Sequence, residues 1–94
     1  MRVDTFKRTQ DNWYGNYKIT GDARVSDLVE VSFLKLLNTE GSELNWRVCV
    51  WGNDDFGLER DFEHEAEAWV TFLEVIGQEY VNQQYLRNNG FIGA

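Results

Sequence analysis

Two alternating runs at the centre of the chain constrain the fold more than any other feature of the sequence. In residues 44–51 (LNWRVCVW), two sets of side chains alternate, one formed by Leu44, Trp46, Val48 and Val50 and the other by Asn45, Arg47, Cys49 and Trp51. This period of two is that of a β-strand, whose successive side chains point to opposite faces. Residues 27–37 (DLVEVSFLKLL) are rich in β-branched and aromatic residues, and residues 38–43 between the runs have turn-forming composition. Together they predict an antiparallel hairpin.

Shorter segments extend this hairpin into a larger sheet. Residues 58–62 (LERDF) follow a turn that glycines bracket at residues 52–57, and they predict a third strand. Upstream, residues 13–20 (WYGNYKIT) predict another strand, after which Gly21 and Asp22 predict a turn. Residues 3–8 predict an edge strand.

The C-terminal third changes to helical periodicity. Apolar side chains recur at steps of four and three, at Phe62, Ala66, Trp69, Leu73, Ile76 and Tyr80. We expect Asp61 to cap the N-terminus of this helix and Gly77 to end or kink it. A second helical piece is expected over residues 79–89. Gly90 suits the left-handed position beyond its end, with Phe91 folding back on Leu86.

These elements predict an α+β fold in a single domain, residues 1–94. Its sheet is expected to be an antiparallel β-meander of three to five strands, with one or two C-terminal helices packed on one face. The other face carries Arg47, Cys49 and Trp51. It either stays partly open, as a contact surface, or is covered by the N-terminal segment.

Composition excludes several classes of protein. The 94 residues are 43% apolar and 15% aromatic, which is enough for a core. The net charge of −7 argues against a general nucleic-acid binder, which needs positive charge to displace counterions. No apolar run approaches the ~18 residues that span a membrane. Cys49 is the one cysteine, so no internal disulfide can form, and we expect a cytoplasmic location.

Few residues suit catalysis or metal binding. His64 is the only histidine, lies between two glutamates and reads as a solvated surface residue. Cys49 lies between two valines and reads as a structural cysteine rather than a nucleophile. One histidine and one cysteine cannot supply a tetrahedral zinc site. We therefore expect no catalytic residues, no metal site and no cofactor.

The charge imbalance is concentrated in residues 53–67. This segment holds one arginine, Arg60, against seven carboxylates: Asp54, Asp55, Glu59, Asp61, Glu63, Glu65 and Glu67. Like charges at this density repel one another, and a fold that keeps them can use them to attract a cationic partner. The alternative is an acidic solvated face that keeps the protein in solution. The candidate partner-binding residues add two aromatic anchors and the helix flank, giving Trp51, Asp54, Asp55, Phe56, Glu59, Asp61, Glu63, Glu67 and Glu74.

Residues 48–77 (VCVWGNDDFGLERDFEHEAEAWVTFLEVIG) form a strand, an acidic turn, a short strand and an amphipathic helix. In this order of elements and in its acidic composition, the stretch resembles small acidic bacteriophage proteins, a group that includes host-takeover factors and anti-CRISPR-type inhibitors. The resemblance implies a phage-encoded, non-enzymatic protein that inhibits or regulates a nucleic-acid-handling host protein by binding its basic surface, with nucleic-acid mimicry as one route. It carries over no functional residue.

Two alternatives come from other classes of protein. The first is a structural or assembly subunit that forms a homodimer through the open sheet face around Trp51. The second is a single-stranded nucleic-acid binder, because the N-terminal segment interleaves cations with aromatic rings that can stack on bases. These residues are Arg2, Phe6, Lys7, Arg8, Trp13, Tyr14, Tyr17, Lys18 and Arg24.

Overall fold

The computed structural model describes residues 5–7, 13–26, 29–36, 45–52, 57–78 and 82–93. Seven strands and two helices lie within these residues. In chain order they are β1 (Thr5–Lys7), β2 (Trp13–Tyr14), β3 (Tyr17–Ser26), β4 (Val29–Leu36), β5 (Trp46–Gly52), β6 (Gly57–Phe62), α1 (Glu65–Ile76), α2 (Gln83–Asn88) and β7 (Ile92–Gly93). Within the described ranges, no helix combines the length and the apolar character that crossing a bilayer requires.

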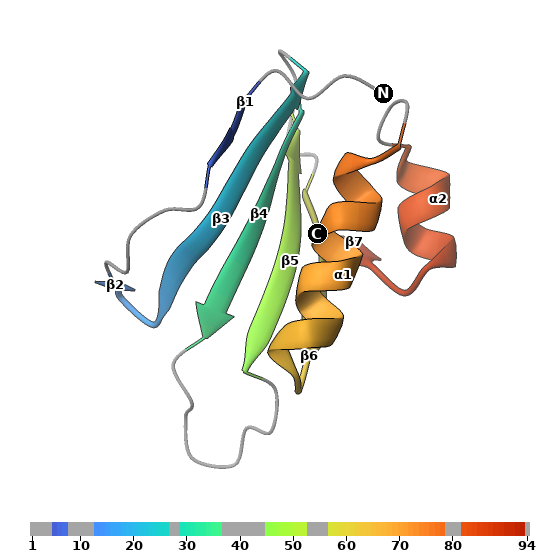
Figure 1. Ribbon diagram of the computed structural model, residues 1–94. Coiled ribbons are helices and arrows are strands. Elements are labelled where there is room, and N and C mark those ends of the chain that lie inside the picture. The colour runs from blue at the N-terminus through green and yellow to red at the C-terminus, as the bar shows by residue number, and fades with distance from the viewer. Residues whose placement is uncertain are drawn as a thin grey trace.

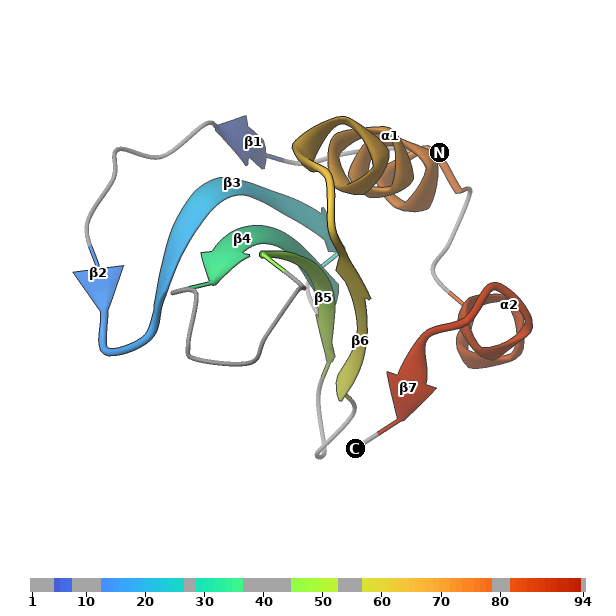
Figure 2. The ribbon, with the colours of Figure 1, turned by 90° about the horizontal axis from the view of Figure 1, so that it is seen from below.

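The four long strands form an antiparallel meander. They pair in chain order from β3 to β6, while β1 extends the sheet beyond β3 and β7 extends it beyond β6. β2 also pairs with β3. The sheet is strongly curved, and both helices lie on the same side of it (Figures 1 and 2). The predicted α+β class, an antiparallel sheet with C-terminal helices, is therefore confirmed.

The core lies between the sheet and the helices and is centred on aromatic rings. The Phe33 ring on β4 stacks on Trp46 of β5, with 5.3 Å between centroids, and lies 5.8 Å from Phe72 of α1. Trp69 stacks on Phe72 at 5.4 Å. The buried apolar side chains that surround these rings are Ala23, Val25, Val31, Val48, Val50, Leu58, Phe62, Ala68, Val75, Ile76, Leu86 and Phe91.

The central hairpin has the predicted form. β4 pairs with β5 in a regular register that places Phe33 opposite Val48 and Val31 opposite Val50. The predicted third strand is β6, antiparallel to β5. The edge strand predicted over residues 3–8 is present as β1, which pairs with β3. The turn residues at 38–43 and 53–56 lie outside the described residues.

The prediction for residues 13–22 was wrong in two respects. A turn at Gly15, whose φ is +66°, divides the expected single strand into β2 and the start of β3. Gly21 and Asp22 do not form a turn but lie inside β3, beside a register shift in its pairing with β4. A Cβ at Gly21 would lie 3.7 Å from the Phe72 ring. This glycine therefore lies against the helix that covers the sheet. The Gly-Asp pair has the composition of a turn, although it lies within a strand.

The predicted rotation of the first helix was also wrong. Ala66 and Leu73, assigned to the core stripe, are exposed. The buried side chains of α1 are Ala68, Phe72, Val75 and Ile76, so of the predicted stripe on this helix only Ile76 is buried, and Trp69 packs partly buried against the core. Asp61 is not the N-cap, because it lies in β6, and His64 occupies the cap position. The helix carries apolar residues around most of its circumference, so a stripe drawn at steps of three and four is not unique.

The ends of both helices follow residue chemistry. α1 ends at Gly77, as predicted. The side chain of Asn82 caps α2 by accepting hydrogen bonds from the backbone N–H groups of Gln84 and Tyr85. Gly90 takes a φ of +87°, and the Phe91 N–H donates to the Leu86 carbonyl at 3.0 Å. This confirms the predicted Schellman arrangement, although α2 is shorter than the predicted range.

Neighbouring residues on α1 provide a test of its rotation. We expect Phe72→Ala to lower the free energy of unfolding by about 3–5 kcal/mol, because it empties a fully buried ring position. Leu73→Ala should change it by less than about 1 kcal/mol, since Leu73 is 42% exposed. Urea denaturation followed by far-UV circular dichroism measures both. Equal losses, or a larger loss for Leu73→Ala, would contradict the observed rotation.

Candidate functional site

The alternation of side chains along β5 and β6 divides the predicted partner-binding residues between the two faces of the sheet. Val50 on β5 and Leu58 on β6 point to the helix side and are buried in the core. Their neighbours Trp51 and Glu59 therefore point to the opposite side, which we call the open face. Asp61 shares this face with Glu59, because the two are two positions apart along the strand.

On the open face, Arg47 is paired with two of the predicted carboxylates. Its guanidinium donates two hydrogen bonds to Asp61, Nε to Oδ1 at 2.5 Å and Nη2 to Oδ2 at 2.9 Å. Nη1 also lies 3.3 Å from Oε2 of Glu59. The hydrogen bond to Asp61 raises the pKa of Arg47, and partial burial opposes the shift. A cation that binds here must compete with the Arg47 guanidinium for both carboxylates.

Trp51 is exposed at one end of the open face. Its side chain is 52% exposed, and its neighbours across the strands are Glu30 on β4 and Gly57 on β6. Glu30 lies 3.8 Å from Arg24, so this pair is also internally compensated. Ile92, on β7 opposite Glu59, is 68% exposed. The open face thus presents apolar side chains among paired charges.

Cys49 occupies the middle of the open face but is buried. Desolvation raises the pKa of its thiol to about 12, and the negative charge of Glu59 adds to the shift, while Arg47 opposes it. A cavity of about 60 Å³, lined in part by Cys49 and Trp51, adjoins the thiol. Because the thiolate is the reactive form, this environment leaves the cysteine a weak nucleophile at neutral pH.

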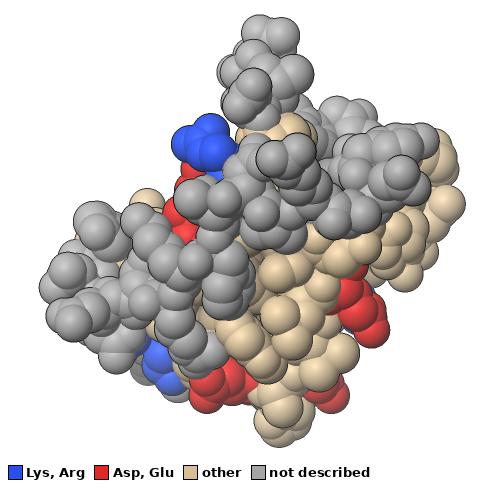
Figure 3. Space-filling view, turned by 45° about the horizontal axis from the view of Figure 1, so that its top comes forward, with Lys and Arg blue, Asp and Glu red and all other residues tan. Residues whose placement is uncertain are grey.

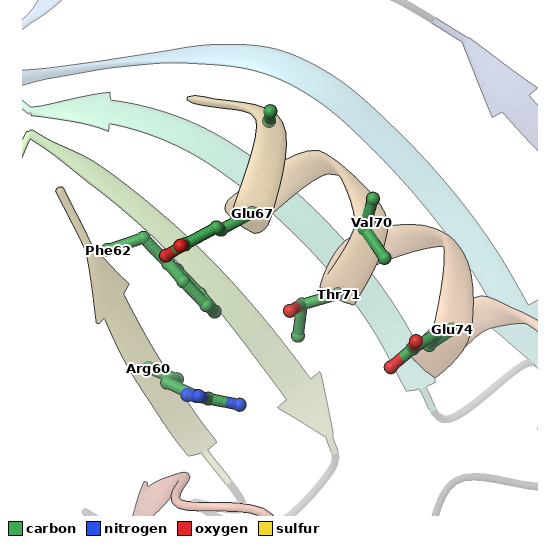
Figure 4. A pocket seen from close by; sticks show the side chains of 7 residues that line it. Arg60, Phe62, Glu67, Val70, Thr71 and Glu74 are labelled. Carbon is green, nitrogen blue, oxygen red and sulfur yellow. The ribbon is translucent and has the colours of Figure 1, made fainter. Parts of the chain in front are cut away.

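Glu67 and Glu74, two of the predicted carboxylates, line a groove on the helix side of the molecule. This groove, the α1 groove, has a volume of about 490 Å³ and is lined by Arg60, Phe62, Ala66, Glu67, Val70, Thr71 and Glu74. In Figure 4, Glu67, Thr71 and Glu74 point from α1 into the space that Arg60 enters from β6. The volume falls within the ~300–1,000 Å³ typical of ligand-binding clefts.

The helical period explains why these α1 residues share one wall. Glu67, Thr71 and Glu74 are spaced by four and three residues, so they lie one above another on the helix surface. Val70 adjoins them and is 53% exposed, and the exposed Leu73 lies beyond it. The wall therefore combines carboxylates with exposed apolar side chains.

Arg60 forms the opposite wall and is held in place. Its Nη1 donates a hydrogen bond of 3.0 Å to the carbonyl oxygen of Asn89, at the C-terminal end of α2. Its guanidinium also lies over the Phe62 ring, with 4.8 Å from Cζ to the centroid. Within the described residues, neither Glu67 nor Glu74 forms an ion pair with Arg60 or any other cation. The groove thus has one cationic wall and one anionic wall.

The predicted acidic surface does not form one patch from its described members. Glu59, Asp61 and Trp51 lie on the open face, whereas Glu67 and Glu74 line the α1 groove. On the face drawn in Figure 3, the described carboxylates appear in separate places.

The remaining predicted residues lie outside both groups. Glu63 is exposed before α1, with its carboxylate 4.0 Å from His64. Asp54, Asp55 and Phe56 lie outside the described residues.

Five of the seven groove residues were not among the predicted partner-binding residues: Phe62 and Ala66, which were assigned to the apolar stripe, and Arg60, Val70 and Thr71. For Arg60 a signal was present, because its alternation with Asp61 and Phe62 places it on the helix side of β6. Val70 and Thr71 depend on the rotation of α1, which the ambiguous apolar pattern did not define.

The basic N-terminal segment is only partly described. Lys18 lies on β3 opposite Lys35, and Arg24 is paired with Glu30. The side chains of Phe6, Lys7, Trp13 and Tyr14, and all of Arg2 and Arg8, lie outside the described parts. Among the side chains that are described, no three His, Cys, Asp or Glu residues are grouped to hold a metal ion.

Comparison of the chain with known proteins yields no match among family models, curated protein sequences or solved structures.

Two of the open-face ion pairs, Arg47–Asp61 and Arg24–Glu30, should differ in strength. In a double-mutant cycle, Arg47→Ala and Asp61→Ala should show a coupling of about 1–2 kcal/mol, because the pair is bidentate and partly buried. The cycle with Arg24→Ala and Glu30→Ala should show less than about 0.5 kcal/mol, because that pair is more exposed. Urea denaturation gives both values. Equal coupling in the two cycles would contradict the role assigned to Arg47.

The Cys49 thiol should make stability depend on pH in the alkaline range. The pKa of the thiol is about 12 in the folded protein and 9.0 ordinarily, so the unfolded chain loses this proton at a lower pH than the folded protein does. The thiol therefore contributes its full share to the free energy of unfolding below pH 9, and this share is lost as the pH rises to 12. The stability of the wild type relative to Cys49→Ala should therefore fall above pH 9, by up to about 1.4 kcal/mol per pH unit. Urea titrations of both proteins at pH 8, 9 and 10 measure this difference. A constant difference would show that the thiol titrates normally.

Proposed function

We propose that this protein is a non-enzymatic binding protein that uses the α1 groove and the adjoining apolar face of α1 to hold a basic segment of another protein. The observation that carries the proposal is the combination of Glu67 and Glu74, without ion pairs among the described residues, with the exposed side chain of Val70 between them. Surface carboxylates beside exposed apolar side chains supply the two components of a protein interface, charge complementarity and a desolvated centre.

The energetics favour α1 over the open face as the docking surface. A cation that approaches Glu59 or Asp61 must compete with Arg47, which holds both carboxylates. Glu67 and Glu74 form no ion pair within the described residues, so a cation that approaches them has no internal cation to displace, although Arg60 lies on the facing wall. The wider net charge of −7 adds long-range attraction for a basic partner, which raises the association rate at low salt.

The partner class follows from this chemistry. Basic surfaces of the required kind occur on proteins that handle nucleic acids, since such surfaces bind phosphates. Occupying such a surface would inhibit or regulate the partner, and we extend the proposal to a phage-encoded regulator that acts on a host protein in the cytoplasm. Nucleic-acid mimicry is not part of this proposal, because the described carboxylates of the predicted site are divided between the open face and the α1 groove.

A second candidate function is self-association through the open face. It is favoured by the exposure of Trp51 and Ile92 on that face, at 52% and 68%. A homodimer would cover these side chains while leaving the α1 groove free.

Sedimentation equilibrium over a range of protein concentrations distinguishes this candidate, and Trp51→Ser should then shift the protein to the monomer.

The α1 groove can be tested before any natural partner is identified. The immobilised protein is used to select binders from a random library of 16-residue peptides, and single peptides are then titrated by fluorescence anisotropy. We expect selected peptides that are rich in lysine and arginine and whose affinity falls as NaCl rises from 50 to 300 mM. Glu67→Gln and Glu74→Gln should each weaken binding by roughly 1.5- to 5-fold, the effect of one exposed ion pair.

Glu65→Gln is the matched control. Glu65 is also exposed in the first turn of α1 and carries the same charge as Glu67, but it does not line the groove. Its substitution should leave the affinity nearly unchanged. Selection of uncharged peptides, or equal effects of Glu65→Gln and Glu67→Gln, would show that the groove is not the binding site.

A further inference from the structure

We propose that the α1 groove selects a segment carrying both signs of charge, with basic side chains placed against α1 and a carboxylate placed against Arg60. This inference rests on the proposed function, since it specifies the partner of the same groove. A groove meant for any polycation would gain nothing from a fixed guanidinium on one wall, because that charge repels a further cation. Arg60 therefore provides discrimination against uniformly basic segments.

The surroundings of Arg60 suit it to receive a carboxylate. One of its nitrogens, Nη1, donates a hydrogen bond to the Asn89 carbonyl, and the guanidinium lies over the Phe62 ring. An arginine presents five N–H donors in a fixed fork, so other donors remain for a ligand. Immobilisation by Asn89 and Phe62 lowers the entropy that Arg60 would lose on binding.

The opposite wall sets the spacing of the basic residues. Glu67 and Glu74 are seven residues apart on α1, which corresponds to about 10.5 Å at 1.5 Å per residue. A helical segment lying along α1 presents the same spacing with Lys or Arg at positions i and i+7. An apolar side chain between them would contact Val70, and the carboxylate would project from the flank that faces β6.

Three synthetic peptides test this arrangement. Each is a 15-residue helix-forming peptide with two lysines seven residues apart and a leucine between them. They differ at a single position, on the side of the lysines that is away from the leucine and faces Arg60, and this position holds Glu, Gln or Lys. Titrations are made at 300 mM NaCl, where screening shortens the reach of the overall charge. The wild type should bind the Glu peptide more tightly than the Lys peptide by roughly 3- to 20-fold, the combined effect of one attraction and one repulsion.

Variants of Arg60 locate the preference. Arg60→Gln should abolish it, Arg60→Glu should reverse it, and Arg60→Lys should retain its direction. Arg24→Gln removes the same charge from the open face and should leave the preference unchanged. Circular dichroism of each variant checks that it is folded, and Arg60→Lys keeps the test decisive should Arg60→Gln unfold.

The outcomes separate this inference from the proposed function. If all three peptides bind equally and binding still depends on Glu67 and Glu74, the proposed function stands and the selection by Arg60 is wrong. A preference for the Lys peptide, or a preference that Arg60→Gln does not change, also overturns the selection. If no peptide binds while the library selection yields binders that depend on Glu67, the inferred helical spacing is wrong. If neither experiment yields binders, both proposals fail.

Discussion

The packing of Phe72 against Phe33 is the contact on which the rest of the structure depends. It fixes α1 on the curved sheet and sets the rotation of the helix about its axis. With Phe72 and Val75 buried, the opposite side of the helix must carry Val70, Leu73 and Glu74 into the solvent. The α1 groove is therefore a consequence of core packing. A change in the core that rotated the helix would remove the groove even if every residue lining it were retained.

The sequence predicted the strands better than it predicted the helix, for a physical reason. A strand has two faces, so the alternation of residues 46–51 allows only two choices of the face that points to the core. The face that carries Val48 and Val50 is the apolar one, and this decides between the two choices. A helix has a continuous surface, and apolar residues surround most of α1. Both the predicted stripe through Leu73 and the observed stripe through Phe72 satisfy the helical period. Only the shape of the sheet beneath, including the space at Gly21, distinguishes them.

The candidate site was partly predictable for a related reason. Sequence position identified the acidic residues but not their neighbours in space. Asp61 and Glu67 are six residues apart in the sequence and both carry a carboxylate. Asp61 is held by Arg47 across the β5–β6 ladder, whereas Glu67 lines the groove without an ion pair among the described residues. The register that places Arg47 opposite Asp61 depends on the connection between the two strands, and the sequence pattern alone did not define it. Counting charges along the chain therefore does not show which of the carboxylates share a surface.

The hydrogen bond from Arg60 to the Asn89 carbonyl joins the groove to the C-terminal part of the fold. α2 has only six residues, too few to be stable as an isolated helix, and it is held by the burial of Leu86 and by the Schellman turn at Gly90. A ligand that drew the guanidinium away from Asn89 would loosen this turn, while one that shared the guanidinium would tighten it. Thermodynamic linkage makes the relation reciprocal. Amide exchange in α2 and β7 would thus report on the state of a groove that those elements do not line.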